Sequence, residues 1–263
     1  MLNVSLFQSS NWEKMSPKQR VDALQGLENT MAAEQGRTPR NIQPTEFGNN
    51  NTLGQYRPQD PNNLYINKNL IKSNDGNYQA MQTTIHEGRH AYQDDCITGK
   101  IKPLPQDMNK VESWSHNMPS RGGHYNVSGV EYRYQPVEAD ANDYAREKLD
   151  SYDSQFSNDP AYAQHTDRRN SYENFLENQA KATYGDDYQQ KINAGIERNY
   201  QAMQQNEQII PDQDNEQEKP FNFRQDKARR EQIAQQSKPT LRNDVSTDKS
   251  ESSSQSTSKG QGR

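Results

Sequence analysis

Two histidines and a glutamate occur close together in the segment T-T-I-H-E-G-R-H-A-Y-Q-D-D, residues 83–95. His86, Glu87 and His90 have the spacing H-E-x-x-H. On an α-helix, positions i and i+4 lie on one face, so two neutral imidazoles can bind one zinc ion while Glu87 points toward the water on that metal. This spacing is typical of enzymes that hydrolyse peptide bonds.

A helix is required at this place, because the two imidazoles converge on one metal only when the backbone is helical. Residues 77–96 contain no proline, and apolar side chains recur there at steps near three, four and seven: Tyr78, Met81, Ile85 and Tyr92. The pattern predicts a buried amphipathic helix. Gly88 lowers its helix propensity by about 1 kcal/mol relative to alanine. A residue this small would either leave room for a substrate or allow another helix to approach closely.

A catalytic zinc site usually has three protein ligands and keeps a fourth position for water. Glu138, 48 residues beyond His90, is the candidate for the third ligand. It follows Pro136, which fits the first turn of a helix because its missing N–H matters little there. The small residues Ala141 and Ala145 would let that helix pack close to another helix.

Other residues compete for the third position. In the metzincin pattern the third ligand stands six residues after the second histidine, where this chain has Cys96. The glycine that turns the chain in that pattern is replaced here by Gln93, so we expect Cys96 to be a small buried residue. The remaining histidines are alternative ligands: His116 and His124, in or near predicted loops, and His165.

Two motifs together carry a family resemblance. The combination of H-E-G-R-H-A-Y-Q with Y-x-x-Q-P-V-E-A-D-A-x-x-Y-A resembles small bacterial zincin-type, gluzincin-like metallopeptidases. These include toxin-type domains of Gram-positive bacteria and, more loosely, ImmA/IrrE-type proteases. The resemblance covers about residues 12–150. It implies that His86, His90 and Glu138 bind one zinc ion per chain and that Glu87 is the general base.

One position departs from that family pattern. Gluzincins commonly have an aspartate four residues after the ligand glutamate, where it orients a histidine of the first motif, but this chain has Asn142 there. Asp140 and Asp143 lie on either side of Asn142. The sequence therefore leaves open which residue orients the histidines.

The expected reaction is hydrolysis of a peptide bond, with Glu87 activating a zinc-bound water and passing its proton to the leaving amine. A negative charge develops on the substrate oxygen during this reaction and needs another hydrogen-bond donor. The candidates are Tyr132, Arg133 and Tyr134.

The surrounding segments predict further helices and a few strands. Ser16 and Pro17 begin a helix that Gly36 ends, and residues 37–61, rich in Asn, Gln, Pro and Gly, are expected to be irregular. The segments 64–66 and 70–71 are the best strand candidates. A strand beside the metal helix would let an extended substrate add its backbone to the edge of the sheet. Residues 119–129 are expected to form a loop.

We therefore predict a mostly helical α+β, zincin-like metallopeptidase domain over residues 1–204, with a small β-sheet beside the active-site helix. Residues 205–263 are polar and have almost no clustered apolar side chains. Such a segment buries too little surface to offset its ordering entropy, so we predict a disordered tail with a possible binding partner.

Composition and net charge limit the classes of protein to which this chain can belong. The net charge of −5 gives no electrostatic reason to bind nucleic acid or an anionic membrane, and the single cysteine, Cys96, excludes an intramolecular disulfide. The first residues lack a basic leader followed by a long apolar stretch. We expect a soluble protein that is cytoplasmic, or exported without a conventional signal peptide, and that acts on a protein or peptide substrate.

A second interpretation belongs to a different class. The chain would then be a non-catalytic regulatory or interaction protein with a structural or vestigial zinc site. A structural site is normally closed by a fourth protein ligand, which His116, His124 or Cys96 would have to supply. The intact Glu87 argues against this interpretation, because a structural site has no need of a base.

Overall fold

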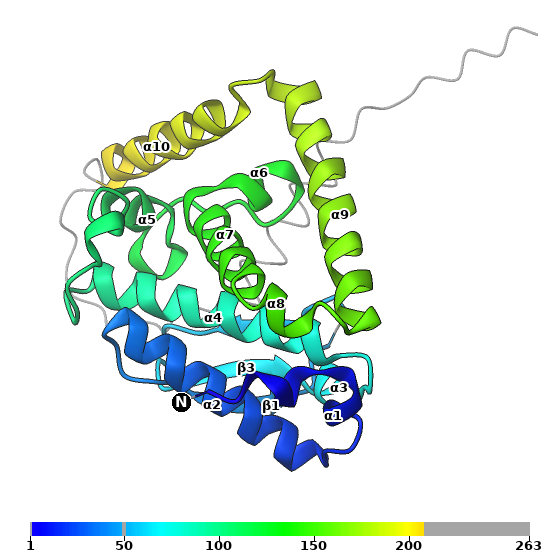
Figure 1. The fold of residues 1–263 in the computed structure, drawn as a ribbon. Coiled ribbons are helices and arrows are strands. Elements are labelled where there is room, and N and C mark those ends of the chain that lie inside the picture. The colour runs from blue at the N-terminus through cyan, green and yellow to red at the C-terminus, as the bar shows by residue number, and fades with distance from the viewer. Residues whose placement is uncertain (1, 49–50, 208–263) are drawn as a thin grey trace, which may run out of the picture. The chain divides into compact units, whose positions relative to one another are not determined.

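The computed structural model describes residues 2–48 and 51–207. Within this part the chain is an α+β protein, mostly helical, with one three-stranded sheet (Figure 1). The predicted disordered tail lies outside the described residues from position 208 onward. None of the described helices is both long enough and apolar enough to cross a membrane.

The N-terminal segment forms η1 (Val4–Phe7), α1 (Ser9–Trp12) and α2 (Pro17–Gln35). The predicted caps of α2 are confirmed. The Ser16 side chain accepts a hydrogen bond from the backbone of Gln19, and the Gln19 side chain bonds back to the Ser16 backbone. At the other end Gly36 has φ 67°, a left-handed conformation that glycine adopts without strain.

The sheet contains β1 (Asn41–Thr45), β2 (Gly54–Tyr56) and β3 (Asn63–Asn67) in the order β1-β3-β2. β1 runs parallel to β3, and β2 runs antiparallel to it. The strand predicted at residues 64–66 is confirmed as β3. The prediction that residues 37–61 are irregular was wrong in part, because this segment supplies both β1 and β2.

The strand predicted at residues 70–71 was wrong. These residues belong to the short helix α3 (Lys68–Lys72). The Asn67 side chain accepts a hydrogen bond from the backbone of Asn69, so the end of β3 serves directly as a helix cap. The apolar pair Leu70–Ile71 therefore packs from a helical turn, with Ile71 buried.

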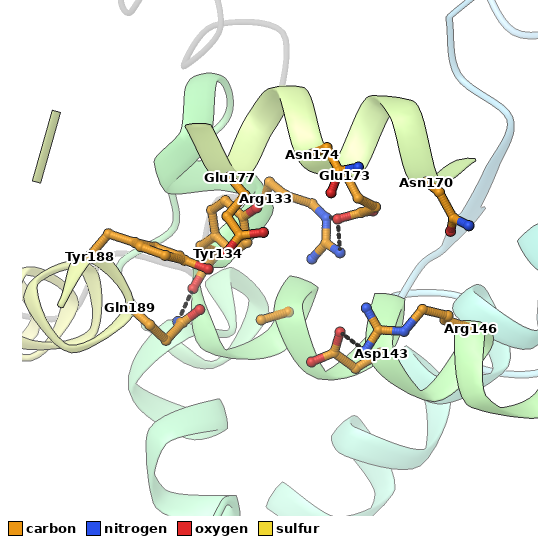
Figure 2. Close-up of a pocket in the computed structure, with 11 residues that line it drawn as sticks. Arg133, Tyr134, Asp143, Arg146, Asn170, Glu173, Asn174, Glu177, Tyr188 and Gln189 are labelled. Carbon is orange, nitrogen blue, oxygen red and sulfur yellow. Dashed lines mark hydrogen bonds and ion pairs between the residues drawn. The ribbon is translucent and has the colours of Figure 1, made fainter. Parts of the chain in front are cut away.

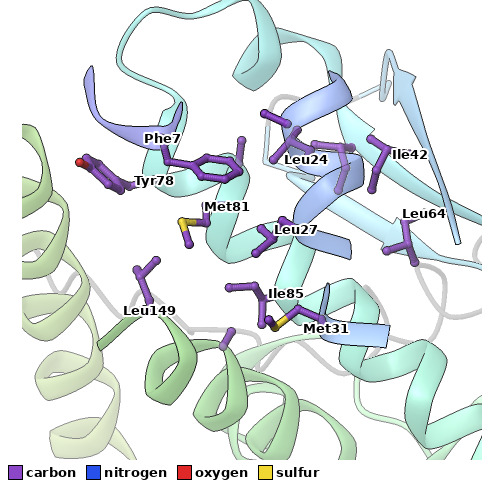
Figure 3. Packing of buried hydrophobic residues seen from close by; sticks show 14 of the residues in the cluster. Phe7, Leu24, Leu27, Met31, Ile42, Leu64, Tyr78, Met81, Ile85 and Leu149 are labelled. Carbon is purple, nitrogen blue, oxygen red and sulfur yellow. The ribbon is translucent and has the colours of Figure 1, made fainter. Parts of the chain in front are cut away.

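Helix α4 (Asn77–Ile97) is the helix predicted around H-E-x-x-H and is the central element of the fold. It contacts α2, β2, β3 and α7 (Pro136–Asp150), and 16 of its 21 residues are buried. Tyr78, Met81 and Ile85 lie in the main core with residues of α2, the sheet and α7 (Figure 3). Burial on several sides fixes the direction in which each side chain of α4 points.

The remaining elements follow α4 along the chain. Pro136 is the first residue of α7, as predicted. Met108, which precedes the short helix α5 (Val111–Asn117), is exposed, whereas Trp114 on that helix is buried. These elements are η2 (Pro105–Asp107), α5 (Val111–Asn117), η3 (Pro119–Arg121), α6 (Gly129–Tyr134), α8 (Asp153–Phe156), α9 (Pro160–Tyr184) and α10 (Tyr188–Glu207).

Candidate metal centre

His86 and His90 from α4 meet Glu138 from α7. The two Nε2 atoms are 3.1 Å apart. His86 Nε2 lies 3.4 Å from Glu138 Oε2, and His90 Nε2 lies 3.3 Å from Glu138 Oε1. The structure thus brings together the three residues that the sequence predicts as metal ligands.

Close packing of α7 against α4 places Glu138. Ala141 and Ala145 are completely buried on α7, and their small side chains permit this close approach. Because Pro136 begins α7, Glu138 falls in the first helical turn and reaches the histidines from there. The helix pairing predicted from the small residues is confirmed.

The two oxygens of Glu138 have different surroundings. Oε1 accepts a hydrogen bond of 2.6 Å from the hydroxyl of Tyr125, whereas Oε2 is buried without a hydrogen-bond partner. Burial on its own would raise the pKa of Glu138, but the two histidines hold it well below its ordinary value. A buried, ionised oxygen without a hydrogen-bond partner is an unsatisfied acceptor, and a bound cation would satisfy it.

These distances fit a zinc ion. Zinc bonds nitrogen and oxygen at about 2.0–2.1 Å, so ligand atoms at the corners of a tetrahedron lie about 3.3 Å from one another. The two Nε2 atoms are 3.1 Å apart, and each lies at a similar distance from one carboxylate oxygen of Glu138: His90 at 3.3 Å from Oε1 and His86 at 3.4 Å from Oε2. Imidazole nitrogen and carboxylate oxygen are also atoms that zinc prefers. The donor set therefore suits zinc both in chemistry and in spacing.

Glu87 projects from α4 toward the sheet. Its Oε2 accepts a hydrogen bond of 2.7 Å from the backbone N–H of Tyr56 in β2. Burial raises the pKa of Glu87, although the neighbouring histidines oppose this effect. A Cβ added to Gly54 would lie 2.5 Å from Thr83 and 2.9 Å from Glu87 Cγ, so glycine is needed for β2 to come this close.

Tyr56 also connects Glu87 to η3, which follows α5 in the chain. Its hydroxyl donates to Asp94 at 2.9 Å. Asp94 is completely buried and accepts two further hydrogen bonds from Arg121 of η3, at 2.9 and 2.7 Å. The backbone of Tyr56 therefore holds the candidate base. Its side chain holds the segment after α5 through Asp94.

Gly88 lies on the face of α4 that contacts α2. A Cβ at this position would lie 2.8 Å from Arg37 Nη2 and 2.9 Å from Glu28 Oε2. These two residues form a completely buried ion pair at 2.5 Å. Of the two explanations that the sequence left open for Gly88, the structure supports close packing.

Of the three candidate donors for a developing negative charge, only Tyr132 lies near the ligands. Burial, together with the charges of Glu138 and Glu87, raises the pKa of the Tyr132 hydroxyl, which therefore stays protonated. Its ring packs edge-on against Tyr125 with centroids 5.9 Å apart.

Arg133 and Tyr134 face a different part of the molecule. Both line a cavity of about 470 Å³ formed by α6, α7, α9 and α10, which none of the three ligands lines (Figure 2). Arg133 pairs there with Glu173 at 2.6 Å, and Tyr134 packs on Tyr188. Neither residue is placed to act at the metal centre.

The alternative ligands lie elsewhere in the described part of the chain. His116 contacts Glu197 at 2.6 Å, His124 contacts Asn199 at 3.0 Å, and His165 contacts Gln82 at 2.8 Å. Cys96 is buried in the cluster that contains Tyr92 and Trp114, as predicted. None of the four belongs to the ligand group found among the described residues.

The side chain that contacts His90 Nδ1 is that of Gln93. Its Oε1 lies 2.9 Å from His90 Nδ1, and its Nε2 donates to Asp140 at 2.8 Å. Asn142 instead donates to the backbone oxygen of Glu138, and Asp143 pairs with Arg146. Tyr125 was not predicted either: it lies in a segment that showed only the glycine and serine content of a loop.

The chain was compared with protein-family models, with curated proteins and with solved structures. Nothing matches. The geometry of the centre is therefore the basis on which its function is inferred.

Proposed function

We propose that the chain is a zinc-dependent metallopeptidase of zincin-like fold that binds one zinc ion. One observation carries the proposal: His86, His90 and Glu138 form a three-donor group, and Glu87 extends from the same helical turn. Among the described residues no fourth His, Cys, Asp or Glu joins this group. Three protein ligands beside a carboxylate suit a catalytic zinc site better than a structural one.

His86 and His90 would hold the zinc ion through Nε2 and Glu138 through its unpartnered Oε2. A zinc ion held there would polarise the scissile carbonyl and lower the pKa of a water to about 7. Glu87, with its raised pKa, is suited to accept a proton and to return it to the leaving amine. The Tyr56 N–H fixes the direction of the Glu87 carboxylate. The Tyr132 hydroxyl supplies a hydrogen bond to the substrate oxygen.

An extended peptide would lie along β2. β3 cannot accept a further strand, because β1 and β2 already pair with its two sides. β2 is at the edge of the sheet and lies directly against Glu87. Backbone pairing at this edge would present the scissile bond to the metal centre.

Elemental analysis of the purified protein tests the metal site. We expect about one zinc per wild-type chain and its loss in His86→Ala and Glu138→Ala, because each variant removes one of three ligands. Circular dichroism checks that both variants are folded. Zinc retained in folded Glu138→Ala would contradict this assignment of the third ligand.

Glu87→Gln tests the reaction. This variant should keep its zinc and its fold but hydrolyse fluorescein-labelled casein or a quenched-fluorescent peptide library about a hundredfold to ten-thousandfold more slowly, because the general base is lost. Equal rates in the two proteins would refute the mechanism. Wild-type protein that binds zinc but cleaves none of these substrates would favour the non-catalytic interpretation.

A further inference from the structure

The Gln93 side chain lies between a metal ligand and a carboxylate. Gln93 is completely buried on α4, one helical turn after His90. Its amide nitrogen donates to Asp140 Oδ2 at 2.8 Å and to the backbone oxygen of Val137 at 3.0 Å. Its amide oxygen lies 2.9 Å from His90 Nδ1.

These contacts determine the orientation of the amide. The two neighbours of Nε2, a carboxylate and a backbone carbonyl, can only accept hydrogen bonds, so the NH2 group must face them. The oxygen of Gln93 therefore faces His90, and Nδ1 of that ring must be the donor. In the neutral ring Nε2 then carries the lone pair, and it points toward His86 and Glu138.

Asp140 is itself held firmly. It receives hydrogen bonds from Arg89 at 2.7 and 3.0 Å and from Lys110 at 2.9 Å. Arg89 also pairs with Asp107 at 2.8 Å. The carboxylate that orients the Gln93 amide is therefore fixed by α4, α7 and the segment before α5 together.

We propose that Gln93 is a positioning residue of the metal centre: its amide, held in one direction by Asp140, keeps the Nε2 lone pair of His90 directed at the metal position. This inference rests on the proposed zinc site. Glu138 and Asp140 are two residues apart on α7, so that one helix supplies a ligand directly and orients a second ligand through Gln93. An indirect contact of this kind normally contributes about 10- to 100-fold to metal affinity.

Gln93→Met tests the proposal, because methionine keeps the length of the side chain but cannot accept the His90 N–H. The measurement is zinc affinity, by competition between the protein and a fluorescent chelator. We expect the Kd for Zn²⁺ to rise about 10- to 100-fold. Gln79→Met, on α4 about three helical turns before His90, is the matched control and should bind zinc like the wild type.

A double-mutant cycle separates positioning from simple packing. Asp140→Asn keeps the size of the side chain but removes the charge that orients the Gln93 amide, so this variant alone should bind zinc more weakly. Gln93→Met should then cost less zinc affinity in the Asp140→Asn background than in the wild type, because both substitutions act through the same contact. Strictly additive losses in Gln93→Met/Asp140→Asn would overturn the proposal.

The proposed function and the role of Gln93 are contradicted by different results. Wild-type protein that binds no zinc would overturn both the proposed function and the role of Gln93. Wild-type protein that binds zinc but cleaves no peptide would count only against the proposed function, because the affinity series still decides the role of Gln93. Unchanged zinc affinity in Gln93→Met would overturn that role alone.

Discussion

Tyr132, Arg133 and Tyr134 are consecutive in the sequence but have different surroundings. Tyr132 lies close to Glu87 and Glu138, whereas its two neighbours line the cavity on the other side of α6. The reason is helical: successive side chains on α6 are about 100° apart, so three consecutive residues cannot all face the same side of the helix. Which of the three residues faces the candidate metal centre depends on how α6 packs, and the local sequence does not predict that packing.

Tyr132→Phe removes the candidate donor without removing the ring. We expect kcat for peptide hydrolysis to fall roughly a hundredfold to a thousandfold, as on loss of one donor to a developing oxyanion, while the zinc content stays at one per chain. Tyr134→Phe makes the same substitution two residues later and should leave kcat unchanged. Equal kcat values for Tyr132→Phe and the wild type would exclude Tyr132 from this role.

Residue spacing predicted which side chains meet at the candidate metal centre but not the side chains that support them. His86, Glu87 and His90 are linked by one helical repeat, and Glu138 follows from the need for a third ligand. Tyr125 was missed because its contact with Glu138 joins a loop to a helix, and neither end of that contact has a local signal. Gln93 has no more local signal than Tyr125, since its role depends on Asp140 from another helix.

The contact between α2 and α4 is unusually close at Gly88. The buried Glu28–Arg37 pair occupies the space where a side chain at this position would project. Both partners of the pair are removed from water, so their mutual contact must be kept for either to remain buried. The H-E-x-x-H turn therefore carries the candidate ligands on one face and supports a buried ion pair on another.

Gly88→Ala should destabilise the protein by about 2 to 4 kcal/mol, because the added methyl group forces the ion pair apart. Gly26→Ala on α2 is the matched control, since its Cβ would meet only Leu2, at 3.9 Å. That variant should gain about 0.5 to 1 kcal/mol from higher helix propensity. Urea unfolding measures both changes, and a neutral Gly88→Ala would contradict this account of the packing.

The helices were predicted better than the strands, for a physical reason. α2, α4 and α7 have caps, an N-terminal proline or a sustained apolar repeat, and these signals are local. β1 reads N-I-Q-P-T, with Pro44 inside it, and β2 has only three residues. Such strands exist because β3 pairs with both of them, and Pro44 is tolerated because β1 is at the sheet edge.

Across the whole molecule, α9 ties the second half of the described chain to the first. Asp159, which caps α9, accepts hydrogen bonds from the Tyr78 hydroxyl at 2.8 Å and the Ser9 backbone at 2.6 Å. Six residues further along, His165 contacts Gln82 of α4. Burial, with Arg169 and Arg168 nearby, lowers the pKa of His165 from 6.5 to about 4.

The lowered pKa of His165 makes the free energy of unfolding decrease as the solution becomes more acidic. Below pH 6.5 the unfolded chain binds a proton at His165 that the folded chain does not, so stability falls as the pH drops toward 4. Between pH 6.5 and 5 this group should remove about 1 to 2 kcal/mol of unfolding free energy. Urea unfolding at both pH values, for wild type and His165→Gln, measures it.

The variant His165→Gln cannot titrate, so its loss of stability over the same interval should be smaller than that of the wild type. The carboxylates and the other histidines titrate equally in both proteins. Their contributions therefore cancel when the two losses of stability are compared. Identical losses in the two proteins would mean that His165 is protonated in the folded state as readily as in the unfolded chain.

The deep burial of α4 also affects how fast its backbone amides exchange with solvent. Backbone amides exchange with deuterated solvent only when the structure around them opens, and opening is rarest where an element is packed on several sides. α4 is such an element, whereas α9 exposes large residues such as Tyr172 and Phe175 to solvent. The outer helices can therefore open and close many times while His86 and His90 keep their separation, so the candidate metal centre persists while the segments around it fluctuate.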